Sequence, residues 1–173
     1  MATASSVKGT GGINFSQQDT YPQFPVGHVE RDTNGGSWLY TKANTALTSG
    51  LMYKRLTDGT VGSATVAQDA VDRDCSGFSP VMFVCWPQQA FAAGVYGWVA
   101  LSGKAVQASV ATGIAAGTKL YTSTTPGVLQ STGTSDYPIV GDAYTVGNTT
   151  GGAAVISISV TGCEPFLGGV VNV

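Results

Sequence analysis

The feature that most constrains the fold of this chain is its succession of short apolar runs separated by glycine- and proline-containing turns. The runs recur at roughly 8–12-residue spacing, which is typical of an all-β domain. No run keeps the 3.6-residue apolar period of an amphipathic helix over about ten positions. The 24 glycines agree with many tight turns. We therefore predict an all-β fold, a β-sandwich or a tulip-like barrel of short antiparallel strands, with an extended N-terminal arm and a C-terminal tail.

Strand-like runs follow one another along most of the chain. They cover residues 26–31, 37–43, 50–56, 61–67, 79–86, 95–101, 104–110, 118–123, 127–131, 139–146 and 153–160. Residues 79–86 are apolar at nearly every position, which predicts a central strand buried on both faces. Residues 155–160 alternate between apolar and polar, as a half-buried strand does. Between the first two runs, Gly35 and Gly36 are expected to supply the positive φ of a hairpin turn.

One turn pattern occurs three times, with an apolar residue, two small or polar residues and a glycine before a strand that contains an aromatic residue. The copies are Leu47–Gly50, Phe91–Gly94 and Ile114–Gly117. We expect the apolar residue to anchor the loop in the core and the glycine to adopt a turn conformation that other residues avoid. The unequal spacing excludes a solenoid repeat.

The chain divides by composition into an N-terminal arm (residues 1–25), a β-domain (26–161) and a C-terminal tail (162–173). The arm contains glycines, prolines and three aromatic residues, although disordered tails are usually poor in aromatics. Two interpretations are open for these rings. They cover the edge of their own domain, or they dock on a neighbouring molecule.

Charge is the most unusual property of the composition, because only 10% of the residues are charged against about 25% in an average soluble domain. The surface must therefore consist largely of Thr, Ser, Gly, Ala and Asn, and it has little charge to resist association. The net charge is −2 and no basic run occurs, so neither a nucleic acid nor a membrane surface is an expected partner.

Targeting and membrane segments are not indicated. The first 16 residues lack the apolar region of a signal peptide. No stretch approaches the roughly 18 apolar residues of a membrane helix. We expect a protein that is made in a cytoplasm and stays soluble.

Residues suited to catalysis or to metal binding are few. His28 is the single histidine, and no Gly-x-Ser-x-Gly motif accompanies it. Asp69, Asp72 and Asp74 lie close in sequence but lack the spacing of an EF-hand, so a solvated turn is the expectation. We predict no enzymatic activity and no cofactor or metal.

The three cysteines and three tryptophans are expected to be structural. An odd cysteine count argues against a disulfide framework. Buried thiols are therefore expected at Cys75, Cys85 and Cys163, with a Cys75–Cys85 bridge left open. The tryptophans at 38, 86 and 98 lie inside strand-like runs, which predicts positions in the core rather than on a sugar-stacking platform.

The stretch from about Phe24 to Val160 resembles the decoration (cement) proteins of tailed bacteriophages. The matching order begins with Phe24–Gly27 before a strand, a glycine turn and Trp38–Ala43. It continues with a turn at 46–50, then residues 97–103, 104–110, 114–121, 127–130, 139–143 and 153–160. The pattern near the C-terminal end is Gly-Thr-x-Leu-Tyr, then Gly-x-Leu, then Ile-Val-Gly-x-Ala. The longer arm and the tail of this chain depart from the simplest such proteins.

The resemblance implies a structural virion protein that binds the outer surface of an icosahedral capsid and stabilises it by bridging capsid subunits. The implied partners are the major capsid protein and neighbouring copies of the chain, commonly as a trimer. The expected capsid or protomer interface comprises apolar residues of arm and tail: Phe15, Tyr21, Phe24, Phe166, Leu167, Val170 and Val171. The tail could add a strand to a partner's sheet. Deleting residues 1–20 is expected to weaken shell binding without unfolding the domain.

Other functions remain open from the sequence. The main alternative is a receptor- or carbohydrate-binding head or fibre domain, which would carry exposed Trp or Tyr on its loops. A secreted β-sandwich enzyme is disfavoured by the scarcity of catalytic residues. A shell subunit is disfavoured because 173 residues are few for a major capsid protein.

Overall fold

The computed structural model describes residues 9, 11–55, 58, 60–64, 84–132, 139–143 and 154–160. Every regular element in these residues is a β-strand, which confirms the all-β prediction. The strands are β1 (Gln18–Asp19), β2 (Val29–Arg31), β3 (Ser37–Lys42), β4 (Tyr53–Arg55), β5 (Val61–Ala64), β6 (Val84–Cys85), β7 (Tyr96–Val110), β8 (Lys119–Thr122), β9 (Leu129–Gln130), β10 (Ile139–Ala143) and β11 (Ala154–Val160). They form two mostly antiparallel sheets, as in a β-sandwich.

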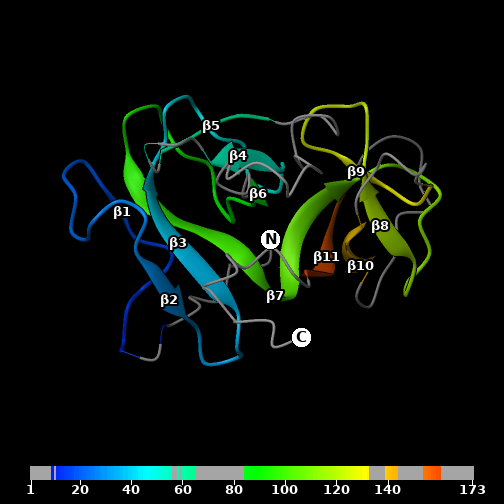
Figure 1. Ribbon diagram of the computed structural model, residues 1–173, viewed down its shortest axis with the longest axis horizontal. Helices are drawn as coiled ribbons and strands as arrows, with labels where there is room; N and C mark the ends of the chain where they lie inside the picture. Colours follow the sequence, from blue (N-terminus) through cyan, green and yellow to red (C-terminus); the bar gives the residue numbers. More distant parts are fainter. Residues whose placement is uncertain are drawn as a thin grey trace, which may run out of the picture.

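The long strand β7 organises the fold (Figure 1). The sequence predicted two strands here, at 95–101 and 104–110, but the structure has one strand of 15 residues. It remains continuous through an irregularity at Gly103 (φ 134°) and Ala105 (φ 62°). The register against β11 shifts at this point, between Ile158 and Val160. A bulge of this kind bends a strand without ending it, so β7 serves two parts of the molecule.

The first half of β7 has pairing partners along both of its sides. It pairs with β3, where Tyr40 faces Trp98, and β2 lies beyond β3 at the edge. On its other side, β7 pairs with β1. The small sheet β5–β4–β6 approaches the same side of β7, because Trp86 and Ala100 exchange two backbone hydrogen bonds of 2.9 Å.

The second half of β7 belongs to a closed ring of strand pairings. β7 pairs with β11, β11 with β10, β10 with β8, β8 with β9, and β9 returns to β7. The last contact is parallel and joins Val110 to Leu129. Closure of this kind removes the open edges of a sheet. In Figure 1 the ring lies beside the β2–β3 region, with β7 running through both.

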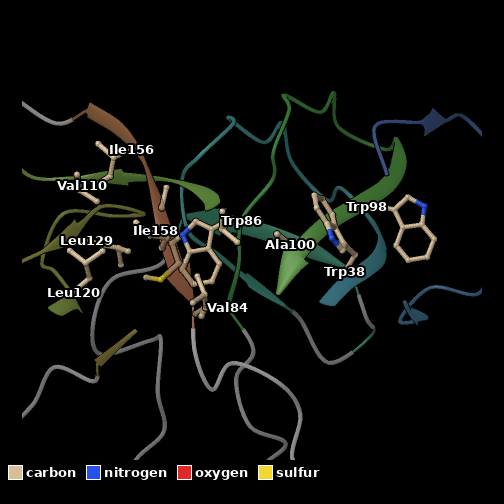
Figure 2. Packing of buried hydrophobic residues seen from close by; sticks show 14 of the residues in the cluster. Trp38, Val84, Trp86, Trp98, Ala100, Val110, Leu120, Leu129, Ile156 and Ile158 are labelled. Carbon is tan, nitrogen blue, oxygen red and sulfur yellow. The ribbon is translucent and has the colours of Figure 1, made fainter. Parts of the chain in front are cut away.

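The two faces of β3 and β7 contribute to separate core clusters. Trp38 and Tyr40 belong to one cluster, which also contains Trp98 and the residues inside the ring. Leu39 and Val99 belong to the other, which faces the β5–β4–β6 sheet. This division follows from the alternation of side chains along a strand. Figure 2 shows the Trp86 indole between Ala100 and the aliphatic side chains that line the closed ring of strands.

The repeated turn of the sequence has the predicted conformation. Gly50, Gly94 and Gly117 have φ values of 79°, 85° and 77°. In each turn, the backbone N–H of the residue after the glycine donates a hydrogen bond of 3.2–3.4 Å to the carbonyl of the residue two positions before the glycine. The apolar residues that open the three turns are buried: Leu47, Phe91 and Ile114. A glycine third in a four-residue turn of this kind is typical of type II.

Two further turns with the same arrangement were not predicted. In residues 125–128, the glycine after Pro126 has φ 75°, and Val128 donates to Thr125. In residues 25–28, Gly27 has φ 95° and His28 donates to Pro25. The run predicted as a strand at 26–31 therefore begins with a turn, and strand β2 starts only at Val29.

The hairpin turn between β2 and β3 differs in one detail from the prediction. Gly35 has the predicted positive φ (83°), whereas Gly36 is not among the residues with positive φ. A Cβ atom on Gly36 would lie 2.5 Å from Asp32 Oδ2. Gly36 is therefore required by close approach of the Asp32 carboxylate rather than by its φ angle.

Candidate interaction surface

The arm residue Phe15 is inserted into the chain's own core. Its ring is 2% exposed. It stacks on Trp38 with a centroid distance of 4.7 Å and meets Trp98 edge-on at 5.1 Å. Ring pairs in these geometries are favourable beyond the area that they bury. Trp38 and Trp98 lie on adjacent strands, so together they form an aromatic socket for Phe15, here called the Trp38–Trp98 socket.

Phe24 lies on the same face of the sheet but is only partly buried. Its ring meets Tyr40 and Trp98 edge-on, both at 5.2 Å, and stacks on His28 at 5.8 Å. Phe24 therefore extends the aromatic layer beyond Phe15, and its ring remains partly exposed.

The hydroxyl of Tyr40 fastens the arm to β3. It donates a hydrogen bond of 3.1 Å to Asp19 Oδ2 and accepts one of 3.0 Å from the Gln23 backbone N–H. Burial raises the pKa of Tyr40 above its ordinary value, and the bond to Asp19 acts in the same direction. The neutral hydroxyl is thus the form that holds both sides of the Thr20–Pro22 connection.

Side-chain amides tie the arm to the loop before β7. Gln18 Nε2 donates to the Ala90 carbonyl at 2.7 Å, and Gln89 Nε2 donates to the Ser16 carbonyl at 3.0 Å. The two bonds run in opposite directions between the same two segments. They supplement the short β1–β7 pairing, which joins only two residue pairs.

The exposed apolar side chains concentrate in one segment, residues 21–29, called here the 21–29 segment. Tyr21 is 77% exposed, and Val26 and Val29 are also exposed. Val155 on β11 is the remaining large apolar residue that is exposed in the described part of the chain. From residue 20 to residue 29, every exposed side chain is uncharged. The segment therefore presents an apolar and uncharged surface.

Charged groups near this surface are paired locally. His28 Nε2 lies 3.0 Å from Glu30 Oε1. The Lys42 ammonium lies 5.6 Å from the centroid of the Tyr96 ring, a distance that suits a cation–π contact.

The structure distributes the predicted interface residues unevenly. It buries Phe15, half-buries Phe24 and exposes Tyr21. The tail residues lie outside the described part of the chain: Phe166, Leu167, Val170 and Val171. The arm contacts the sheet from Ile13 to Phe24, and the division at residue 25 stays a prediction, as does the interface itself.

Residues considered for chemistry are accounted for only in part. His28 packs beside Phe24 and Trp98 and contacts Glu30. Asp69, Asp72 and Asp74, together with Cys75 and Cys163, lie outside the described residues, whereas Cys85 is buried. Among the residues that are described, no group of three or more His, Cys, Asp or Glu side chains is placed to hold a metal ion. No helix in that part of the chain is long and apolar enough to cross a membrane.

Sequence reasoning missed the exposed valines and the Tyr40 contacts. Val26 and Val29 were assigned to a strand, and both are exposed, Val26 in the turn at 25–28 and Val29 at the start of β2. The signal available was Pro25 followed two residues later by Gly27, because Pro and Gly in this order favour a turn. The Tyr40–Asp19 bond has no local signal, since 21 residues separate its partners.

Comparisons with known proteins give likeness to solved structures alone. No protein-family model matches the sequence, and no curated protein matches it. Among solved structures, the chain is similar to the N base of the head fiber gp8.5 of bacteriophage phi29. The superposition covers 72% of this chain and 92% of that chain, with 14% sequence identity and a TM-score of 0.44.

Proposed function

We propose that this protein is a non-enzymatic structural component of a tailed-phage virion. It binds the outer surface of the capsid and stabilises it by bridging capsid subunits. Its partners are the major capsid protein and neighbouring copies of itself, as a trimer. The protein acts without a cofactor, and its place is the exterior of the capsid.

The observation that carries the proposal is the uncharged surface of the 21–29 segment. Its exposed residues include Tyr21, Val26 and Val29 as well as two prolines. A surface without charges is buried against a partner at little electrostatic cost. Prolines restrict the chain beforehand, so less conformational entropy is lost on binding. An interface of this composition suits a permanent assembly.

The C-terminal motifs of the resemblance to decoration proteins support the proposal, because they coincide with one structural unit. Residues 117–121 contain a turn and the start of β8, and residues 127–130 contain a turn and β9. Residues 139–143 are β10, and residues 153–160 contain β11. All four strands belong to the closed ring of pairings. This part of the resemblance thus concerns the complete ring of strands rather than scattered turns.

Binding to shells tests the proposal directly. The purified protein is combined with DNA-free shells of the cognate major capsid protein and analysed by size-exclusion chromatography with light scattering. We expect stoichiometric and saturable co-elution. Tyr21→Ala should weaken binding at least about tenfold, since exposed aromatic residues are frequent hot spots. Thr124→Ala, at an exposed position in the loop after β8, serves as the matched control and should bind normally. A protein that elutes apart from shells at all ratios would contradict the proposal.

The alternative of a carbohydrate-binding head domain predicts aromatic rings exposed on loops. Tyr21 meets that description, whereas Trp38, Trp86 and Trp98 are all buried. A glycan array distinguishes the two functions. Saturable binding to one glycan class, lost in Tyr21→Ala and accompanied by no binding to shells, would favour the head-domain alternative.

A further inference from the structure

The described residues of segment 9–19 form a plug that is anchored to the rest of the molecule at several points. Phe15 fills the Trp38–Trp98 socket. Strand β1 adds two residue pairs to the edge of β7. Gln18 and Asp19 bind partners at Ala90 and Tyr40. The plug is therefore held by a compact set of contacts that any identical chain could provide.

The connection that joins this plug to the β-domain is short and exposed. Thr20, Tyr21 and Pro22 are all exposed. On the far side of the connection, Gln23 and Phe24 are anchored to Tyr40. The connection therefore separates two well-anchored segments. Short hinge loops invite exchange of an element between copies.

We infer that neighbouring copies of this chain exchange residues 9–19, so that Phe15 of one copy occupies the Trp38–Trp98 socket of the next. The exchange recreates contacts that already exist within one chain, so it needs no new complementary surface. The low charge of the protein, 10% of its residues, leaves little repulsion between copies. The inference goes beyond capsid binding and concerns the contact between copies.

One detail of the structure fits exchange of the arm. The Tyr40 hydroxyl binds on both sides of the connection, at Asp19 and Gln23. After exchange, the same hydroxyl would hold Gln23 of its own chain and Asp19 of the partner subunit.

An isotope-mixing cross-link tests the exchange without any shell. Asp19 and Tyr96 are direct partners in the antiparallel β1–β7 pair, and the Cα spacing of such partners, about 4.5–5.5 Å, fits a disulfide. The full-length double variant Asp19→Cys/Tyr96→Cys is prepared unlabelled and with ¹⁵N. The two batches are mixed, unfolded, refolded together and oxidised. Mass spectrometry then identifies the peptides that link positions 19 and 96.

Linked peptides that contain one light and one heavy partner are the expected result. With equal amounts and complete exchange, about half of the linked peptides should be mixed. The mixed fraction should increase with the protein concentration during refolding. Phe15→Ala in the same background should lower the total yield of linked peptides, because the plug loses its main anchor.

Linked peptides of one isotope alone, at all concentrations, would show that the arm stays within its chain and would overturn the inference. Absence of any link between positions 19 and 96 would also overturn it, because the β1–β7 pairing would then be missing. A Thr124→Cys variant, exposed and distant in sequence from the arm, controls for random disulfides between copies. Failure of this test leaves the shell-binding measurement unaffected.

Discussion

At the scale of single residues, two buried indoles, those of Trp38 and Trp86, differ in how their N–H groups are satisfied. Trp38 Nε1 donates a 2.9 Å hydrogen bond to Asp32 Oδ2. The other oxygen of Asp32 accepts backbone bonds from Asn34 and Gly36, at 2.7 and 2.8 Å. Trp86 Nε1 is buried and has no acceptor within the described part of the chain. A buried N–H without an acceptor is costly. The N–H groups of the two indoles therefore contribute unequally to the stability of the fold.

Replacing each indole by phenylalanine should expose this inequality. Trp38→Phe leaves a buried carboxylate oxygen without its partner and should cost about 1–3 kcal/mol beyond the loss of ring volume. Trp86→Phe removes an unsatisfied donor and should cost only the lost volume. Urea unfolding of both variants measures the difference. A larger destabilisation for Trp86→Phe than for Trp38→Phe would contradict this account.

The Tyr40 hydroxyl makes stability depend on pH in the alkaline range. Its pKa in the folded protein is raised above the ordinary value of 10.0, mainly because the hydroxyl is buried. The folded state therefore keeps this proton more strongly than the unfolded state. The corresponding stability is fully present below pH 10 and is lost as pH rises through the folded pKa. Tyr40→Phe should show a smaller loss of stability above pH 10 than the wild type, measured by urea unfolding across pH.

Tyr21→Phe is the matched control for this titration. Its ring is exposed, so the substitution should leave the alkaline decline as steep as in the wild type. An unchanged decline in Tyr40→Phe would mean that other groups cause it.

At the scale of elements, the arm behaves as a layer of the fold. The side chains of β3 and β7 alternate between two faces, and the β5–β4–β6 sheet packs on one of them. Phe15 and Phe24 pack on the other. Without them, Trp38 and Trp98 would be exposed to water, at a cost of about 25 cal/mol for each Å² of apolar surface. The sheet therefore needs the arm, or an equivalent segment from another copy.

Removal of the arm should consequently destabilise the domain, in contrast to the expectation drawn from sequence. Phe15→Ala should lower the free energy of unfolding by about 3 kcal/mol or more, as for other buried phenylalanines. Deletion of residues 1–20 should cost more, because β1 and the Asp19–Tyr40 bond are lost as well. Denaturant titration at several protein concentrations measures both effects.

Tyr21→Ala provides the reference for this series, since its ring is 77% exposed. It should change stability by less than about 0.5 kcal/mol. Equal stability of the wild type and the deletion variant would show that the aromatic layer is dispensable.

At the scale of the whole molecule, the scarcity of charge sets how the protein can associate. Eight Lys and Arg residues and ten Asp and Glu residues are spread over 173 positions. In the described structure, charged side chains near the 21–29 segment are engaged locally, as in the His28–Glu30 contact of 3.0 Å. Association through this surface must rely on apolar burial and shape rather than on charge.

Shell binding should accordingly be nearly independent of salt. Between 50 mM and 500 mM NaCl, the dissociation constant for shells should change by less than about threefold, because there is little charge to screen. Sedimentation of shells with bound protein at each salt concentration measures this. A loss of affinity of about a hundredfold or more over that range would point to a charged interface instead.

The amino-acid sequence by itself determined the properties that depend on neighbouring residues. The type of structure, the three repeated turns and most strand positions follow from local patterns, since a glycine or an alternating run acts within a few residues. The burial of Trp38, Trp86 and Trp98 was likewise predicted from their place in apolar runs. The uncharged character of the surface follows from composition alone.

Only the tertiary structure decided which distant segments meet. It merged two predicted strands into β7, because a bulge at residues 103–105 bends the strand without interrupting its pairing. It also placed Phe15 in the Trp38–Trp98 socket while leaving Tyr21 in solvent. Both rings lie in the same arm and have similar neighbours in sequence, so no local pattern separates them. The difference arises because Phe15 reaches the uncovered face of β3 and β7, and that face exists only after strands far apart in the chain have paired.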